Sequence, residues 1–182
     1  GSRTTAIGYG ALATQNFTTA TDTYNAAFGF GAGSAVTTGV ENTIIGANSA
    51  DALTTGIRNT TLGLGALGSD TTGSRSTALG YAALNQQNFT TATNANNVAV
   101  GYEAGTAITT GIDNVLIGTN TGDALTDADF NVAVGKVALT ADTLGSRSTA
   151  IGHGALNVQN FTTATDTYNV AVGYHAGVAI TT

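Results

Sequence analysis

The chain has 182 residues, of which only 9% are charged, and its formal net charge is −6 at pH 7. Its five basic residues are too few to neutralise a run of phosphates, which argues against nucleic acid as a partner. It has no cysteine for a disulfide and no apolar run long enough to span a membrane, so we expect no membrane insertion.

Ten glycines, here called the marker glycines, recur at intervals of 21 or 17 residues. They are Gly8, Gly29, Gly46, Gly63, Gly80, Gly101, Gly118, Gly135, Gly152 and Gly173. One interval of 21 and three of 17 form a longer period of 72 residues. A fixed period of about 20 residues is typical of a solenoid, in which each repeat contacts mainly its neighbours. The sequence therefore predicts an all-β parallel solenoid of ten coils, a single repeat domain over residues 1–182 cut from a longer array.

Each marker glycine ends a short phrase in which a small residue stands between two larger ones, as in Thr-Ala-Ile-Gly. This alternation of period two predicts a strand with one face packed inward. We expect the core to consist of the residue before each glycine, namely Ile7, Phe28, Ile45, Leu62, Leu79, Val100, Ile117, Val134, Ile151 and Val172. The small residues would then form a smooth outer face, which is either an intersubunit contact or plain exposed surface.

A second apolar position follows each marker glycine. Half of the coils carry a leucine four residues after the glycine, at Leu12, Leu67, Leu84, Leu139 and Leu156. Coils with Gly or Ala there have an apolar residue three positions later, as at Val36, Leu53, Ile108 and Leu125, whereas two short coils with leucine have Asp70 or Asp142. Since overpacking and a void are both destabilising, one pocket in each coil is expected to be filled from either of two positions.

Turn residues close the coils. Short coils carry Thr-Thr-Gly and then an asparagine (Asn42, Asn59, Asn114), which suits tight corners and a ladder of stacked amides. The three long coils share Gln-Asn-Phe-Thr-Thr-Ala-Thr at 15–21, 87–93 and 159–165. We expect these segments to form loops on every fourth coil, with Phe17, Tyr24, Phe89, Phe161 and Tyr168 as candidate recognition residues.

Motifs that would indicate an enzyme or a cofactor site are weak. The glycines of residues 63–68 fit GxGxxG, but they belong to the repeat and lack the βαβ context of a dinucleotide site. Neither 17 nor 21 is a multiple of six, unlike the hexapeptide rhythm of β-helical acyltransferases. His153 and His175, the candidate bases, are interpreted as solvent-facing variation or as a weak pH sensor. We therefore predict no catalytic residue, no cofactor and no enzymatic activity.

Two further patterns suggest binding. Asp123, Asp127 and Asp129 could offer oxygen ligands to calcium or form a solvated acidic corner, and no metal site is predicted from them. Thr-Ala-Thr at 19–21, 91–93 and 163–165 is similar to the threonine rows of ice-binding solenoids, but it recurs only on every fourth coil.

The phrases Thr-Ala-Ile-Gly-Tyr-Gly-Ala-Leu at 5–12, Thr-Ala-Leu-Gly-Tyr-Ala-Ala-Leu at 77–84 and Asn-Val-Ala-Val-Gly-Tyr-Glu-Ala-Gly at 97–105 carry a resemblance over essentially the whole chain. The chain resembles repeats of bacteriophage tail fibres and of bacterial surface proteins that often end in an endosialidase-type intramolecular chaperone. It is also similar to the head repeat of trimeric autotransporter adhesins, which are left-handed parallel β-rolls assembled as trimers. The resemblance implies an extracellular or virion-borne homotrimeric fibre that helps to contact a host surface.

The expected function is therefore structural: a fibre segment of a phage tail fibre or bacterial surface adhesin, located outside the cell, on the cell surface or on the virion. Its expected partners are further copies of itself, in a homotrimer or filament, and a cell-surface glycan or protein. The alternatives are a self-assembling extracellular filament subunit and, with less support, an ice- or glycan-binding solenoid.

Overall fold

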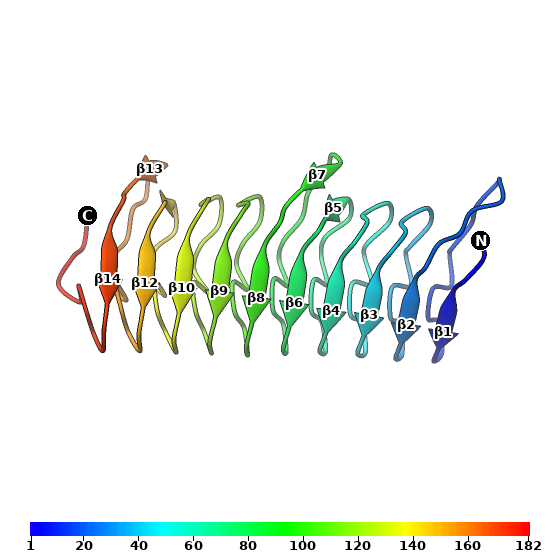
Figure 1. The fold of residues 1–182 in the computed structure, drawn as a ribbon, viewed down its shortest axis with the longest axis horizontal. Coiled ribbons are helices and arrows are strands. Elements are labelled where there is room, and N and C mark those ends of the chain that lie inside the picture. The colour runs from blue at the N-terminus through cyan, green and yellow to red at the C-terminus, as the bar shows by residue number, and fades with distance from the viewer.

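The protein is an all-β parallel solenoid of ten coils, as the marker glycines predict. The computed structural model describes residues 1–182 and contains strands and turns but no helix. The coils follow one another along a rod, with the two termini at opposite ends (Figure 1). The main sheet has one strand from each coil: β1 (Thr5–Ile7), β2 (Ala26–Phe28), β3 (Thr43–Ile45), β4 (Thr60–Leu62), β6 (Thr77–Leu79), β8 (Val98–Val100), β9 (Val115–Ile117), β10 (Val132–Val134), β12 (Thr149–Ile151) and β14 (Val170–Val172).

The long coils add two small sheets at the edge of the rod. In one of them β5 (Gly73–Ser74) pairs with β7 (Thr93–Asn94), and in the other β11 (Gly145–Ser146) pairs with β13 (Thr165–Asp166). A bridge between Ser2 and Asp22 takes the same place in the first long coil. The long-coil loops rise above the neighbouring coils beside the N-terminus, at β7 and at β13 (Figure 1).

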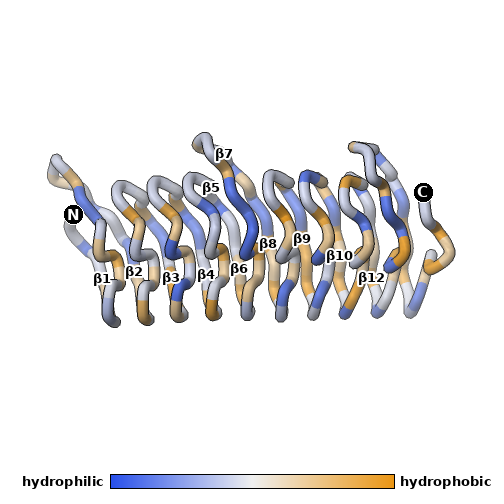
Figure 2. The backbone as a smooth tube through the Cα atoms, turned by 180° about the vertical axis from the view of Figure 1, so that it is seen from behind, coloured by the Kyte–Doolittle hydropathy of each residue, from blue (hydrophilic) through white to orange (hydrophobic).

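The repeat phrases lie directly on top of one another. Ala6 is opposite Ala27 and Ile7 is opposite Phe28, and the same parallel register continues to β14. The N–H of a marker glycine donates to a carbonyl of the preceding coil, as from Gly118 to Val100 at 2.8 Å. Hydrophobic segments therefore recur at corresponding places in successive coils (Figure 2).

The predicted inward face of the strands is wrong by one residue. The ten residues expected in the core are exposed or half-buried on the outside of the chain: Ile7, Phe28, Ile45, Leu62, Leu79, Val100, Ile117, Val134, Ile151 and Val172. The middle residue of each phrase is buried instead from β2 to β14, as at Ala27, Ala99 and Ala150. Because side chains alternate along a strand, a shift of one residue moves the whole set to the other face.

The inside of each coil is narrow, which explains why alanine faces it. The pocket residues reach inward from the wall opposite the sheet. The structure confirms that the pocket of each coil is filled from either of two positions. All are buried: Leu12, Leu67, Leu84, Leu139, Leu156, Val36, Leu53, Ile108 and Leu125. A larger middle residue occurs where that wall has glycine. A Cβ on Gly33 would lie 2.8 Å from Ile44 Cδ1, and one on Gly122 would lie 2.9 Å from Leu116 Cδ2.

A buried row of asparagines joins the coils at the start of the strands, as the turn chemistry predicts. The Asn42 Oδ1 accepts the backbone N–H of Asn59 at 2.9 Å, and the Asn42 Nδ2 donates to the Gly56 carbonyl at 2.9 Å. The Asn114 side chain repeats this pattern with Asn131 and Ala128. Each amide thus satisfies the backbone of the following coil, in the manner of a stacked amide ladder.

Candidate functional site

The most extensive candidate site is the outward side of the ten-stranded sheet, here called the outer face. It consists of the first and third residues of each of the ten strands, and no residue of these ten strands is charged. The third residues form a row of large apolar side chains, with Ile7 53%, Phe28 58% and Val172 67% exposed. Isolated apolar residues are normal on a protein surface, but a continuous row over ten coils indicates an interaction site.

An aromatic row borders the outer face at the corner after the strands. It consists of the residue after each marker glycine: Tyr9, Phe30, Ala47, Leu64, Tyr81, Tyr102, Thr119, Lys136, His153 and Tyr174. The rings stack in pairs on adjacent coils, with centroids 5.6 Å apart for Tyr9 and Phe30 and 5.1 Å apart for Tyr81 and Tyr102. This row is exposed along much of its length and extends the apolar surface around the corner.

His153 and His175 are brought together at the end of this row. The His153 ring stacks on Tyr174 at 5.3 Å and meets the edge of His175 at 5.2 Å. His153 is exposed and His175 half-buried. The two imidazoles therefore lie among aromatic surface residues, which agrees with their interpretation as surface variation.

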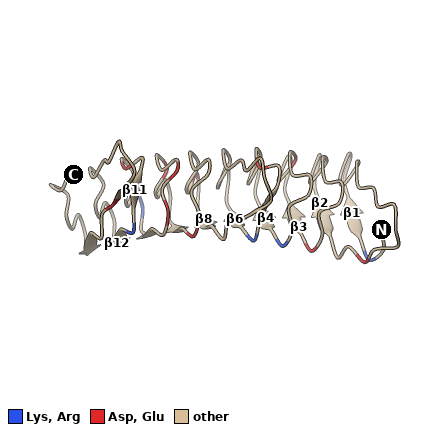
Figure 3. Ribbon diagram, turned by 90° about the horizontal axis from the view of Figure 1, so that it is seen from above, with Lys and Arg blue, Asp and Glu red and all other residues tan.

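A second row, here called the corner row, borders the outer face on the side before the strands. Its members are Arg3, Tyr24, Glu41, Arg58, Arg75, Asn96, Asp113, Phe130, Arg147 and Tyr168, all with positive φ. Charged residues of this row lie along one edge of the rod beside the strands (Figure 3). Arg58 Nε pairs with Glu41 Oε2 at 2.6 Å, and the Arg147 guanidinium lies 4.7 Å from the Phe130 ring centroid. These residues contact one another along the row, between neighbouring coils.

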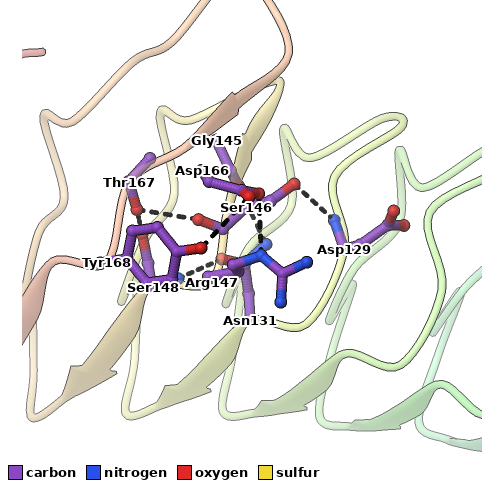
Figure 4. A network of polar contacts seen from close by, with 9 residues as sticks. All are labelled: Asp129, Asn131, Gly145, Ser146, Arg147, Ser148, Asp166, Thr167 and Tyr168. Atoms are coloured by element: carbon purple, nitrogen blue, oxygen red, sulfur yellow. Dashed lines mark hydrogen bonds and ion pairs between the residues drawn. The ribbon is translucent and has the colours of Figure 1, made fainter.

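The third long-coil loop is tied to the corner row by polar contacts (Figure 4). Arg147 Nε pairs with Asp166 Oδ1 at 2.9 Å, and the Tyr168 hydroxyl donates to Asp166 Oδ2 at 3.3 Å. The Ser148 and Thr167 hydroxyls are 2.6 Å apart. Tyr24 and Tyr168 are 51% and 67% exposed, so these two predicted recognition residues are accessible.

The phenylalanines of the long coils are not displayed as predicted. Phe89 is only 6% exposed, and Phe17 and Phe161 are half-buried. Phe89 and Phe161 cover the end of the coil because their loops fold back onto the preceding short coil. Sequence analysis missed the group that holds the loop there, a buried aspartate in that preceding coil.

Asp70 and Asp142 each anchor one loop. Asp142 Oδ2 accepts a hydrogen bond from Gln159 Nε2 at 2.6 Å, and its Oδ1 accepts the N–H groups of Phe161 at 2.9 Å and Gly145 at 3.1 Å. Asp70, which lies one 72-residue period earlier, makes the same contacts with Gln87, Phe89 and Gly73. These buried carboxylates are satisfied by donors on two coils, as buried charges require.

The Asp142→Asn variant is expected to lose about 1–3 kcal/mol of unfolding free energy. Its new amide would face the Gln159 amide, which cannot turn because Asn169 Nδ2 donates to Gln159 Oε1 at 2.8 Å. Urea unfolding measures the loss of stability, and hydrogen exchange at the Phe161 amide measures the release of the loop.

The matched control is Asp166→Asn, which removes one carboxylate charge from the same loop at an exposed ion pair. We expect a change of about 1 kcal/mol or less for this variant. Equal losses for the two variants would show that the buried carboxylate is not the anchor.

The acidic residues considered as calcium ligands do not converge. Asp127 Oδ1 accepts from the Thr110 hydroxyl at 2.6 Å, Asp129 Oδ1 accepts from the Ile112 N–H at 2.7 Å, and Asp123 accepts from Thr140. No group of three acidic or histidine side chains is placed to hold a metal. Burial raises the pKa of the Asp129 carboxyl, the hydrogen bond from Ile112 opposes this, and nearby Asp127 adds to it. The structure thus uses these carboxylates to connect neighbouring coils.

No family model, no curated protein and no solved structure matches the chain. The surface has no pocket, and no helix is present that could cross a membrane.

Proposed function

We propose that the protein is a structural fibre segment in which three copies associate through their outer faces. The observation that carries this proposal is the continuous row of large apolar side chains on the outer face, which spans all ten coils with no charged residue in the ten strands of the main sheet. Exposure of apolar side chains to water is unfavourable, and the free energy falls when a second apolar surface covers them. The thin, alanine-lined interior supports the same conclusion, because each coil buries few large side chains by itself.

The resemblance of the repeats supports a role as part of a phage tail fibre or a bacterial surface adhesin, outside the cell or on the virion. Its role would be to span a distance and to present contact elements to a host surface. The accessible Tyr24 and Tyr168 beside the long-coil loops are the candidates for contact with a cell-surface glycan or protein. An open lateral filament is the alternative assembly, since a row of apolar residues along a rod can also join copies without closure.

Light scattering coupled to size-exclusion chromatography tests the proposal. We expect the mass of three chains for the wild type and the mass of one chain for Val100→Asp/Ile117→Asp, with unchanged circular dichroism. Both substituted positions lie on the outer face, where an aspartate stays solvated in a monomer but is buried without a partner in an assembly.

Thr162→Asp is the control, because Thr162 is exposed on the third loop and belongs to none of the ten strands of the main sheet. It should keep the mass of three chains. A wild type that stays monomeric up to its highest soluble concentration would refute the fibre, and open-ended polymers would favour the filament.

A further inference from the structure

The outer face by itself is too narrow for a stable contact. Ten strands spaced about 4.8 Å apart cover about 43 Å along the rod, and three residues of a strand cover about 10 Å across it. The projected area is therefore about 430 Å², below the about 800 Å² that each partner contributes to a standard interface. In a closed trimer this area is also shared between two neighbours. The rows on either side of the face must then contribute to the contact.

These two rows have complementary chemistry. The corner row holds all four arginines of the chain, at Arg3, Arg58, Arg75 and Arg147. The aromatic row holds four of the six tyrosines together with Phe30, His153 and the only lysine, Lys136. Arginine packs favourably on aromatic rings at distances of up to about 6 Å, and this chain already uses the contact between Arg147 and Phe130.

Arg75 is the corner-row arginine that lacks a partner within the chain. It makes no ion pair and no ring contact, whereas the other three arginines have acidic partners. Its side chain is exposed, and the corner-row residue of the preceding coil is another cation, Arg58. On the far side of β6 lies Tyr81, which stacks on Tyr102 of the next coil. An unpaired guanidinium and an exposed pair of rings thus border the same part of the outer face.

Parallel rotational symmetry brings these groups together. When outer faces turn toward a common axis along the rod, the leading edge of each face meets the trailing edge of its neighbour, which is a heterologous contact. The corner row of one copy then meets the aromatic row of the next. We propose that the copies lie parallel, with Arg75 packed on the ring of Tyr81 or Tyr102 of the neighbouring copy, in the same or the next coil. This inference rests on the proposed trimer.

Among alignments shifted by at most one coil, charge favours these two. In the same-coil alignment Arg75 meets Tyr81, and Phe130 meets Lys136. In the next-coil alignment Arg75 meets Tyr102, and Asp113 meets Lys136, which forms an ion pair. The opposite shift of one coil places Arg147 against Lys136, and like charges at such a contact are unfavourable.

Cross-linking tests the proposal, because the chain has no native cysteine. Arg75→Cys/Tyr81→Cys and Arg75→Cys/Tyr102→Cys place thiols on the two edges of the outer face. In one chain the strand β6 separates residues 75 and 81, and a link within one chain keeps the mass of one chain on a denaturing gel. We expect covalent trimers on denaturing gels from one or both double variants. The single variants should give no cross-linked chains.

The possible results separate this inference from the proposed function. The inference is overturned if the protein has the mass of a trimer but gives no cross-link between residue 75 and residue 81 or 102. It is also overturned if Arg75→Cys alone gives cross-linked dimers. Both results would leave the proposed trimer unaffected. A monomeric mass would refute both.

As a second measurement, Arg75→Gln should raise the half-dissociation concentration of the trimer about tenfold or more, because the lost contact occurs three times. Arg75→Lys, which keeps the cation, should recover most of this effect, and an unchanged Arg75→Gln trimer would count against the contact.

Discussion

Replacing Gly101 by alanine is expected to lower the unfolding free energy by about 4 kcal/mol or more and to disrupt the middle of the rod. The marker glycines have φ between 127° and 143°, a region that L side chains rarely adopt. A Cβ on Gly101 would lie 2.4 Å from the carbonyl oxygen of Gly118 in the next coil. The sheet hydrogen bond from the Gly118 N–H to the Val100 carbonyl, 2.8 Å long, holds these backbones together. Relief of the clash therefore requires separation of two coils.

Gly173→Ala separates the steric effect from the backbone strain. Gly173 has the same backbone conformation, with φ of 134°, but the nearest atom to its added Cβ is the Ala176 Cβ at 3.8 Å. We expect this variant to lose only the strain energy, about 1–3 kcal/mol, and to affect the last coil alone. Urea unfolding and circular dichroism compare the two variants. A loss for Gly173→Ala as large as that for Gly101→Ala would show that contact between the coils is not the cause.

Ala150→Asp is expected to unfold the chain, whereas Ile151→Asp should leave a folded monomer. Ala150 is fully buried between Ala133 and Ala171 of the neighbouring strands, and an aspartate there would bury a charge without a partner. Such a change costs more than about 5 kcal/mol. Ile151 is 38% exposed on the outer face, so an aspartate at that position keeps contact with water and loses about 1 kcal/mol of apolar burial.

Urea unfolding over a dilution series measures this difference. For Ile151→Asp the midpoint should not depend on protein concentration, because the assembly is lost while the coils remain. The wild-type midpoint should rise with concentration, as mass action requires for an associating protein. If Ile151→Asp unfolds as completely as Ala150→Asp, the assignment of the inward face is wrong.

The inward face was predictable only in part, because both faces of the strands carry apolar residues. The phrase Val-Ala-Val alternates whichever side is buried, and volume inside the coil decides between the two alternatives. One signal in the sequence favoured the correct face: the large middle residues Ile44 and Leu116 occur near Gly33 and Gly122, as expected if they share one interior. The large flanking residues show no such compensation.

The loops show a second limit of sequence analysis. From the sequence, Phe89 is expected to be exposed on a loop because it stands in a polar, threonine-rich segment. Its N–H instead binds Asp70, which lies 19 residues earlier in the chain, and this proximity arises only when the coils stack. Tyr24 and Tyr168 are exposed, because both belong to a row at the corner and not to the packed part of the loop.

The sequence by itself determined the coil length, the parallel stack, the position of the strands and the alternative filling of the pocket. These features repeat along the chain, and stacking converts each period into contact between equivalent residues. Only the tertiary structure decided which side of each strand faces inward and which carboxylates hold the loops. Both depend on the space that remains inside a coil once the opposite wall and the neighbouring coils are in place. Close packing of that space leaves room for alanine in most coils, and for the larger Ile44 and Leu116 only beside Gly33 and Gly122.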